Sequence, residues 1–314
     1  MWLIDGVVQH YPWGSKHFIP TLLELTPDGD PWAEYWLGTH PLGVSQLVEE
    51  SQSLARLLVN HPSYLGKQSL TEFGPRLPFL MKVLALEKPL SLQAHPNRAQ
   101  AEAGFTAEQN AGIAYHAPER VFKDPYSKPE LVVALTTFEA LCGFRDPKIS
   151  AELFAELPVH ESLDSIIGPL TERSGPAALA EVFLDVLSVG EDRRHLVDEV
   201  VAAAVNLMDA EGELGEFART AVELDEHFPS DPGILAAMLA NRVRLEPGQA
   251  IYTPAGSMHA YLRGSAIEAQ ANSDNVLRGA LTKKHVDVDG LISVVNFEPT
   301  TKQILEPNGS DGLY

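Results

Sequence analysis

The pattern of apolar and polar positions divides the chain into two kinds of segment. Between residues 151 and 246, apolar residues recur at helical spacing, with acidic residues on the opposite face, in AALAEVFLDVL (177–187), RRHLVDEVVAAAVNLM (193–208) and ILAAMLANRV (234–243). Pro147 after Asp146 and Pro232 after Asp231 are typical of first-turn prolines behind aspartate N-caps. This part of the chain is predicted to be helical.

The rest of the chain has a strand-like pattern. Its apolar segments are short or alternating and are interrupted by Gly and Pro, as in LPFLMKVLAL (77–86), ELVVALTTFEALCGF (130–144), SAIEAQANS (265–273) and DNVLRGAL (274–281). Helices interrupt these strands rather than alternate with them, which argues against a parallel doubly wound sheet. We therefore expect an antiparallel sandwich or jelly roll with a helical insertion.

The net charge of the chain and its distribution limit the classes of molecule that the protein can bind. With 314 residues, 45% of them hydrophobic, the chain can build a large core, and its net charge of −20 argues against nucleic acid and anionic membranes as partners. That charge is uneven, because residues 151–246 hold 20 acidic and 6 basic side chains, whereas residues 247–285 hold 2 acidic and 4 basic ones. A phosphate-binding patch is therefore expected in the second range.

The cysteine content and the chain's start point to a compartment. The single Cys142 excludes a disulfide framework within one chain and fits a reducing environment. The first residues carry no basic region and reach Asp5 and Gly6 before any signal-like apolar stretch. No segment approaches the ~18 apolar residues of a membrane helix. We expect a cytoplasmic protein with no membrane segment.

Two short segments carry candidate metal ligands. In SLQAHP, a strand would place Ser91, Gln93 and His95 on one face. His95 could equally be a hydrogen-bonded core residue. In KPELVVAL, Lys128 and Glu130 share a face at the start of an apolar run, where burying either charge alone is costly. The pair is either a structural ion pair or a metal-binding carboxylate beside a cation.

A third segment completes a possible ligand set. In TPAGSMHAY, a turn is followed by His259 at the start of a predicted strand. Together with Gln93, His95 and Glu130, it supplies two nitrogen and two oxygen ligands and leaves room for a water molecule, which is consistent with a zinc site. Mn²⁺, Fe²⁺ or Co²⁺ would also suit this set, because it contains no thiolate.

A fourth segment supplies further charged groups. Glu268 shares a strand face with Gln270, and the turn at Asp274 returns the chain to Arg278, shortly before Lys284. Exposed basic residues are usually only solvated. Here, however, they lie in the basic range expected to hold a phosphate-binding patch.

These segments, in this order, closely resemble type I phosphomannose isomerases. The matching strings are YPWGS, LPFLMKVLALEKPLSLQAHP, KPELVVALTTFEALCGF, PAGSMHAYL and IEAQANSDNVLRGALTKK, which span most of the chain except its helical part. The resemblance implies a cupin (double-stranded β-helix) core with an inserted helical domain. It also implies a zinc-dependent isomerase that interconverts mannose 6-phosphate and fructose 6-phosphate through a cis-enediol.

The resemblance also implies roles for individual residues. It makes Gln93, His95, Glu130 and His259 the ligands of one zinc ion per chain. The positions implied to be catalytic are Lys82, Lys128, Glu268, Asp274 and Arg278, and those implied to bind substrate are Trp13, Ser91, Tyr261 and Lys284. Glu268 is the first choice as the base that moves the proton, and Lys128 or Lys82 remain alternatives.

The domain boundaries follow from the same comparison. We expect a cupin core over residues 1–150 and 242–297, a helical insertion over residues 151–241, and a monomer. Residues 298–314 form a tail, either of a naturally short member or of a chain cut before a C-terminal cupin. Two other functions stay open: a metal-dependent cupin oxygenase and a non-catalytic protein that binds sugar phosphates.

Overall fold

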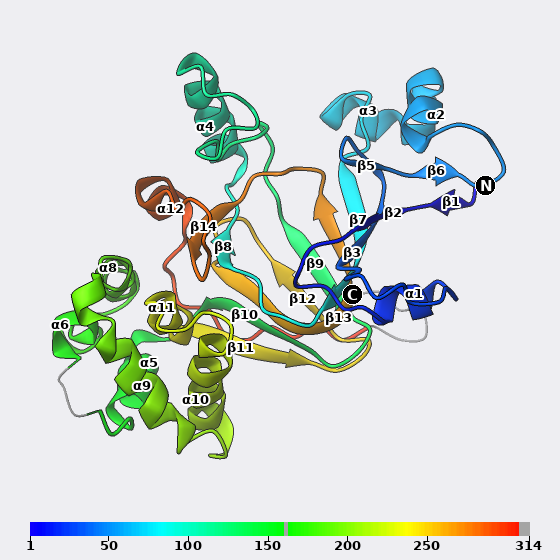
Figure 1. Cartoon of the computed structure of the whole chain (residues 1–314). Coiled ribbons are helices and arrows are strands. Elements are labelled where there is room, and N and C mark those ends of the chain that lie inside the picture. The colour runs from blue at the N-terminus through cyan, green and yellow to red at the C-terminus, as the bar shows by residue number, and fades with distance from the viewer. Residues whose placement is uncertain (160–162, 308–314) are drawn as a thin grey trace.

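A sheet of ten strands forms the centre of the computed structural model, which describes residues 1–159 and 163–307 (Figure 1). Its strands are β2 (Val7–Gln9), β3 (Glu34–Leu37), β7 (Phe79–Leu86), β8 (Leu92–Ala94), β9 (Glu130–Ala134), β10 (Phe138–Phe144), β11 (Ala240–Leu245), β12 (Ala250–Thr253), β13 (His259–Ala271) and β14 (Leu277–Ala280). Two small pairs lie beside it, formed by β1 (Ile4–Asp5) with β6 (Gln46–Leu47) and by β4 (Thr39–His40) with β5 (Gly43–Val44). Every strand pair in the described part of the chain is antiparallel, as predicted.

The long strand β13 joins the parts of this sheet. It pairs with β7, β8, β9 and β10, so it borders most of the strands that carry predicted site residues. Gly264 lies within it at φ +105°, and a Cβ atom there would meet the Thr137 carbonyl oxygen at 2.4 Å. Only glycine fits this position, because it tolerates a positive φ and the close approach of another backbone.

The helices between β10 and β11 confirm the helical prediction for that part of the chain. They are α5 (Pro147–Ala155), α6 (Asp164–Ile167), α7 (Pro169–Glu172), α8 (Pro176–Leu187), the 3₁₀ helix η2 (Glu191–Arg193), α9 (His195–Val205), α10 (Gly212–Asp225) and α11 (Gly233–Met238). Figure 1 shows them gathered at one side of the sheet. Their apolar faces share one buried cluster with sheet residues such as Leu92, Leu141 and Leu277.

The predicted helix starts and ends are right in part. Asp146 caps α5, since its side chain accepts the Lys148 N–H at 2.8 Å. Pro232, predicted in a first turn, is instead the N-cap of α11, although Asp231 still accepts the Gly233 N–H at 2.8 Å. The helix predicted from ILAAMLANRV ends at Met238, because the same apolar run continues as strand β11.

The remaining helices lie around the other parts of the sheet. They are α1 (Phe18–Leu22), α2 (Leu54–Asn60), the 3₁₀ helix η1 (Pro62–Leu65), α3 (Lys67–Phe73), α4 (Arg98–Asn110) and α12 (Val288–Val294). Helix α4 starts with a capping box formed by Asn97 and Gln100 and projects from the body in Figure 1. A loop over residues 111–129 then leads back to β9. Across residues 1–159 and 163–307, no helix is both long and apolar enough to cross a membrane.

Residues 299–305 lie against the sheet. The Thr300 N–H donates to the Phe144 carbonyl at 2.8 Å, and Leu305 forms an isolated antiparallel bridge with Ala250. Gly143 lies opposite Thr300 at φ +65°, where a Cβ atom would approach the Thr300 Oγ1 atom to 2.1 Å. The described part of the predicted tail is therefore packed on β10 and β12.

Candidate active site

A cavity of about 650 Å³ opens on the face of the sheet formed by β3, β7, β8 and β13. The loop before β9 and residues 281–284 complete its wall. Eleven of the thirteen predicted site residues line it: Trp13, Lys82, Ser91, Gln93, Lys128, Glu130, Tyr261, Glu268, Asp274, Arg278 and Lys284. The other two, His95 and His259, are buried and contact Glu130. The structure thus brings all of the predicted residues to one place.

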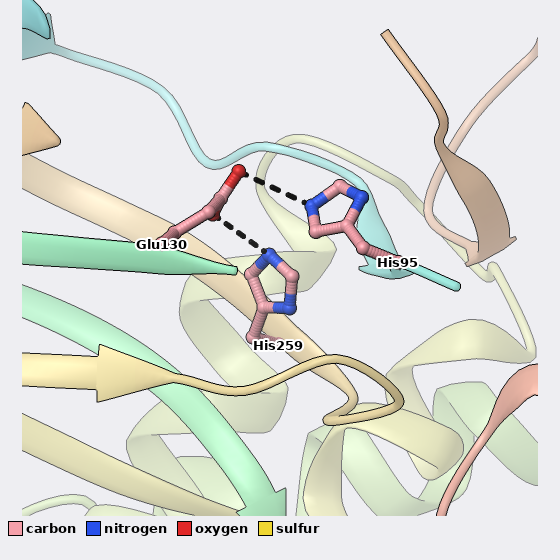
Figure 2. Close-up of side chains that lie close together, drawn as sticks. All are labelled: His95, Glu130 and His259. Carbon is pink, nitrogen blue, oxygen red and sulfur yellow. Dashed lines mark ion pairs between the residues drawn. The ribbon is translucent and has the colours of Figure 1, made fainter. Parts of the chain in front are cut away.

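Two histidines and one carboxylate meet at the floor of this cavity (Figure 2). His95 follows β8, Glu130 opens β9 and His259 opens β13. The Nε2 atom of His95 lies 3.2 Å from Glu130 Oε1, and that of His259 lies 3.4 Å from Oε2. All three residues are at most 2% exposed. Strand ends far apart in the sequence therefore create one compact group of potential metal ligands.

The hydrogen bonds of the two imidazoles show what this group can bind. His95 Nδ1 lies 2.7 Å from the Asn275 carbonyl oxygen, and His259 Nδ1 lies 3.0 Å from that of Ser257. Since a carbonyl only accepts, both Nδ1 atoms carry a hydrogen, and in a neutral ring Nε2 presents a lone pair. Burial and the charge of Lys128 lower the pKa of His95 to about 4, so this ring is neutral near pH 7.

Neither Nε2 atom has a hydrogen-bond partner, although both are buried. The lone pair of the neutral His95 ring, facing a carboxylate, repels it unless a cation lies between them. The donor set of two imidazoles and a carboxylate suits zinc, and the hydrogen bonds at Nδ1 are the kind that orient histidine ligands. The residues present therefore fit the predicted metal ion.

Gln93 lies beside this group. Its partner in the β8–β13 pairing is His259, and its partner in the β8–β14 pairing is Arg278. Directly opposed residues of antiparallel strands project to the same face, and Gln93 lines the cavity. The strand itself is shorter than predicted, since it covers only Leu92–Ala94 and leaves Ser91 and His95 just outside its ends.

Both carboxylate oxygens of Glu130 have partners within the cavity. Its Oε1 atom lies 2.9 Å from the Lys128 Nζ atom, and its Oε2 atom accepts the Tyr261 hydroxyl at 2.8 Å. Burial alone would raise the pKa of Glu130, but the ammonium group of Lys128 holds it well below the ordinary value. Glu130 therefore stays ionised. Lys128 and Glu130 thus form an ion pair, and both residues line the cavity.

A second set of charged residues, Glu34, Lys82 and Glu268, lines the cavity. Lys82 on β7 lies with its Nζ atom 3.5 Å from Glu34 and 3.3 Å from Glu268. Burial would lower the pKa of Lys82, but the two carboxylates outweigh burial and raise it. The pKa of Glu268 is raised to about 7, first by burial and then by the charge of Glu130. Lys82 therefore stays protonated, whereas Glu268 changes its charge near neutral pH.

The sequence analysis did not predict Glu34 as a site residue, although Glu34 is the second carboxylate beside Lys82. Glu34 is buried on β3 and accepts a hydrogen bond from the Trp36 indole. The one available signal is an acidic residue within WAEYWLG, an aromatic strand-like segment. Such a residue is costly to bury without a partner, so it suggests a nearby cation without identifying Lys82.

A group of cations also lines the cavity. Its members Arg278, Lys283 and Lys284 have no ion pair with an acidic residue in the part of the chain that the structure describes. Burial lowers the pKa of Arg278, and burial together with Arg278 lowers that of Lys284. Lys123 also lines the cavity, with its Nζ atom donating to the Tyr115 carbonyl at 2.7 Å. These unpaired charges favour an anionic ligand.

Asp274 connects this part of the cavity to the loop before β9. Its Oδ2 atom lies 3.0 Å from His40 Nε2 and 3.4 Å from the Tyr115 hydroxyl, while its backbone N–H donates to Asp124 at 2.9 Å. Burial would raise the pKa of Asp274, but the hydrogen bond with His40 and the nearby lysines lower it. Asp274 is therefore an ionised residue held in place at the cavity edge.

A buried group of two histidines and a carboxylate below a basic cavity is typical of metal-dependent enzymes with small anionic substrates. The family model for the catalytic domain of type I phosphomannose isomerase matches residues 1–147. The chain is 38% identical over 297 residues to the mannose-6-phosphate isomerase of Salmonella typhimurium, which covers 93% of this chain and 74% of that protein. It is 36% identical over 308 residues to the Escherichia coli enzyme of the same name, with 96% and 76% covered.

Solved structures agree with these relatives. A crystal structure of mannose 6-phosphate isomerase bound with zinc and yttrium superposes with a TM-score of 0.85 at 34% identity and covers 98% of this chain and 78% of that one. A zinc-bound structure of the enzyme gives a TM-score of 0.82 at 34% identity, with 95% and 74% covered. The chain belongs to the type I phosphomannose isomerase family.

Proposed function

We propose that this protein is a zinc-dependent aldose–ketose isomerase that interconverts mannose 6-phosphate and fructose 6-phosphate. The observation that carries the proposal is the buried group of His95, Glu130 and His259, with two unpartnered ring nitrogens, below a cavity that has its own basic side. Relatives 36–38% identical bear the name of this activity. Family membership favours the isomerase over a cupin oxygenase and over a non-catalytic protein that binds sugar phosphates.

The metal ligands are His95, Glu130 and His259, with Gln93 as the fourth. Zinc, when bound, stabilises negative charge on substrate oxygens as a Lewis acid. Lys128 and Tyr261 hold the carboxylate of Glu130 from two sides, which fixes its orientation. Other divalent ions such as Mn²⁺, Fe²⁺ and Co²⁺ suit the same donors.

Glu268 is the base that moves the proton between C1 and C2 through a cis-enediol. General bases work best when their pKa lies near the operating pH, and the pKa of Glu268 is raised to about 7. Lys82 is a poorer choice, because Glu34 and Glu268 keep it protonated. Its ammonium group instead holds the Glu268 carboxylate in place at 3.3 Å. Lys128 similarly pairs with Glu130.

Arg278 and Lys284 bind the phosphate group of the substrate. A guanidinium presents two parallel donors to phosphate, and Arg278 has no acidic partner to compete for them within the described residues. Trp13, Ser91, Tyr261 and Asp274 line the same cavity and contact the rest of the substrate. A phosphate held at a distance fixes the reacting carbons in position.

The finer architecture is also part of the proposal. We assign a cupin core to residues 1–150 and 242–297, an inserted helical domain to residues 151–241 and a tail to residues 298–314, of which 308–314 lie outside the described residues. The antiparallel sheet and the helices between β10 and β11 support this division. We further propose a cytoplasmic monomer that binds neither nucleic acid nor membranes, in keeping with the net charge of −20.

The activity can be tested directly with the purified protein. Mannose 6-phosphate should be converted to fructose 6-phosphate, the conversion should stop after a chelator has removed the metal, and added zinc should restore it. Absence of product in the zinc-loaded sample would refute the isomerase. Product that persists after verified removal of all metal would refute only the role of the metal.

Replacing Arg278 with alanine should lower kcat/KM for mannose 6-phosphate by ~10²-fold, because hydrogen bonds between charged groups contribute about 1.5–3 kcal/mol. Steady-state kinetics and inhibition by inorganic phosphate would measure the loss. Arg244→Ala is a suitable control, since Arg244 is exposed, pairs with Glu246 and lies outside the cavity. If Arg278→Ala leaves both KM and kcat unchanged, Arg278 does not bind the substrate.

A further inference from the structure

Asn275 is a wholly buried residue between β13 and β14 whose side chain binds mainly backbone groups of another loop, with one longer contact of 3.4 Å from its Nδ2 atom to the Asp124 carboxylate. Its Oδ1 atom accepts the N–H groups of Lys123 and Asp124 at 2.7 and 3.2 Å. Its Nδ2 atom donates to the carbonyls of Asp124 and Tyr126 at 2.7 and 2.8 Å. Both donors and both acceptor sites of the amide are thus used, and this holds Asn275 firmly against residues 123–126.

The backbone of the same residue contacts a proposed metal ligand. The Asn275 carbonyl oxygen accepts the Nδ1 hydrogen of His95 at 2.7 Å. This bond keeps the hydrogen on Nδ1, so that Nε2 is the nitrogen free to bind a metal ion. The side-chain hydrogen bonds fix the residue that carries this carbonyl, and therefore they also fix the orientation of the His95 ring.

We propose that Asn275 is the positioning residue for zinc binding, acting through His95. The inference rests on the proposed zinc site and adds to it a residue that touches neither metal nor substrate. Partners that orient a histidine ligand typically change metal affinity 10–100-fold. The same amide also holds the backbone of Lys123, whose side chain lines the cavity, so one buried residue positions both a proposed metal ligand and a cation of the cavity.

The test compares two Asn→Asp variants of the same chain segment. Asn275→Asp has the same shape but replaces the Nδ2 donor with an oxygen that faces two carbonyl oxygens. We expect its zinc dissociation constant to rise ~10–100-fold, as measured by competition with a chromophoric chelator. The visible spectrum of the cobalt-loaded Asn275→Asp variant should also differ from that of the cobalt-loaded wild type. Asn272→Asp is the matched control, because Asn272 donates to the Leu77 carbonyl at 3.2 Å and does not contact His95.

The outcomes separate a positioning role from a structural one. Both variants can lose thermal stability, but only Asn275→Asp should lose zinc affinity. Asn275→Ser, which introduces no charge, should show the same direction of change and serves if Asn275→Asp does not fold. A zinc dissociation constant within twofold of wild type in a folded Asn275 variant would overturn the proposal.

One measurement needs no variant. Ring-nitrogen NMR of the zinc-loaded wild type should show His95 protonated at Nδ1, and protonation at Nε2 would also overturn the proposal. If the wild type itself binds no zinc, the proposed zinc site is wrong. If the wild type binds zinc and the Asn275 variants bind it equally well, only the role of Asn275 is wrong.

Discussion

Replacing Glu268 with glutamine is expected to lower the turnover number for mannose 6-phosphate by ~10²–10⁴-fold, the range that a general base contributes. The amide has nearly the same size and can still accept a hydrogen bond from Lys82, so the fold and the metal ligands should persist. Steady-state kinetics would give the loss, and metal analysis should show unchanged zinc content. Glu102→Gln, on the exposed surface of α4, is the control.

The pH profile makes this prediction more specific. A base must be deprotonated, so kcat/KM of the wild type should fall tenfold per pH unit below a pKa near 7, the value to which burial and Glu130 raise Glu268. The residual activity of Glu268→Gln should lack this acid limb. A variant that keeps near-normal turnover and an unchanged acid limb would show that another group is the base.

Replacing His259 with alanine should remove zinc binding and reduce isomerase activity to background. His259 is 0% exposed, and its buried Nε2 atom has no hydrogen-bond partner and lies 3.4 Å from Glu130 Oε2. Metal analysis of the purified protein should show zinc falling from about one ion per chain to nearly none, because the variant keeps only one imidazole and one carboxylate beside the weakly binding amide of Gln93.

Two controls distinguish loss of zinc binding from loss of folding. Zinc-stripped wild type should have a circular dichroism spectrum like that of His259→Ala, and the exposed His17→Ala variant should keep both zinc and activity. Full zinc occupancy in a folded His259→Ala protein would contradict the assignment of His259 as a ligand.

The sequence predicted the antiparallel strands well but misjudged some boundaries for a physical reason. Residues 234–243 form one apolar run, of which the first part is helix α11 and the last part is strand β11. Both parts are buried nearly all round, so apolar spacing cannot distinguish them. Strand β13 continues from His259 to Ala271 through Gly264, which has a positive φ.

The metal-binding part of the candidate site could be predicted from the sequence, because its residues are polar side chains next to apolar strand segments. His95, Glu130 and His259 stand at strand ends beside turn residues, so their polar character is unusual for their surroundings. Glu34 was missed because its role depends on the pairing of β3 with β7, which local sequence does not determine. The role of Asn275 cannot be predicted from local sequence, which indicates only the turn at Asp274, because its partners lie about 150 residues away in the chain.

The central position of β13 has a consequence for how the protein is made. Strand β7 ends at Leu86, yet its neighbour β13 begins only at His259. At translation rates of about 5–20 residues/s, β7, β9 and β10 remain without this partner for on the order of ten seconds on the ribosome. The metal ligands likewise cannot assemble until His259 has emerged. The catalytic centre therefore forms only after most of its strands have been made, and strands that wait for a partner have edges that can aggregate.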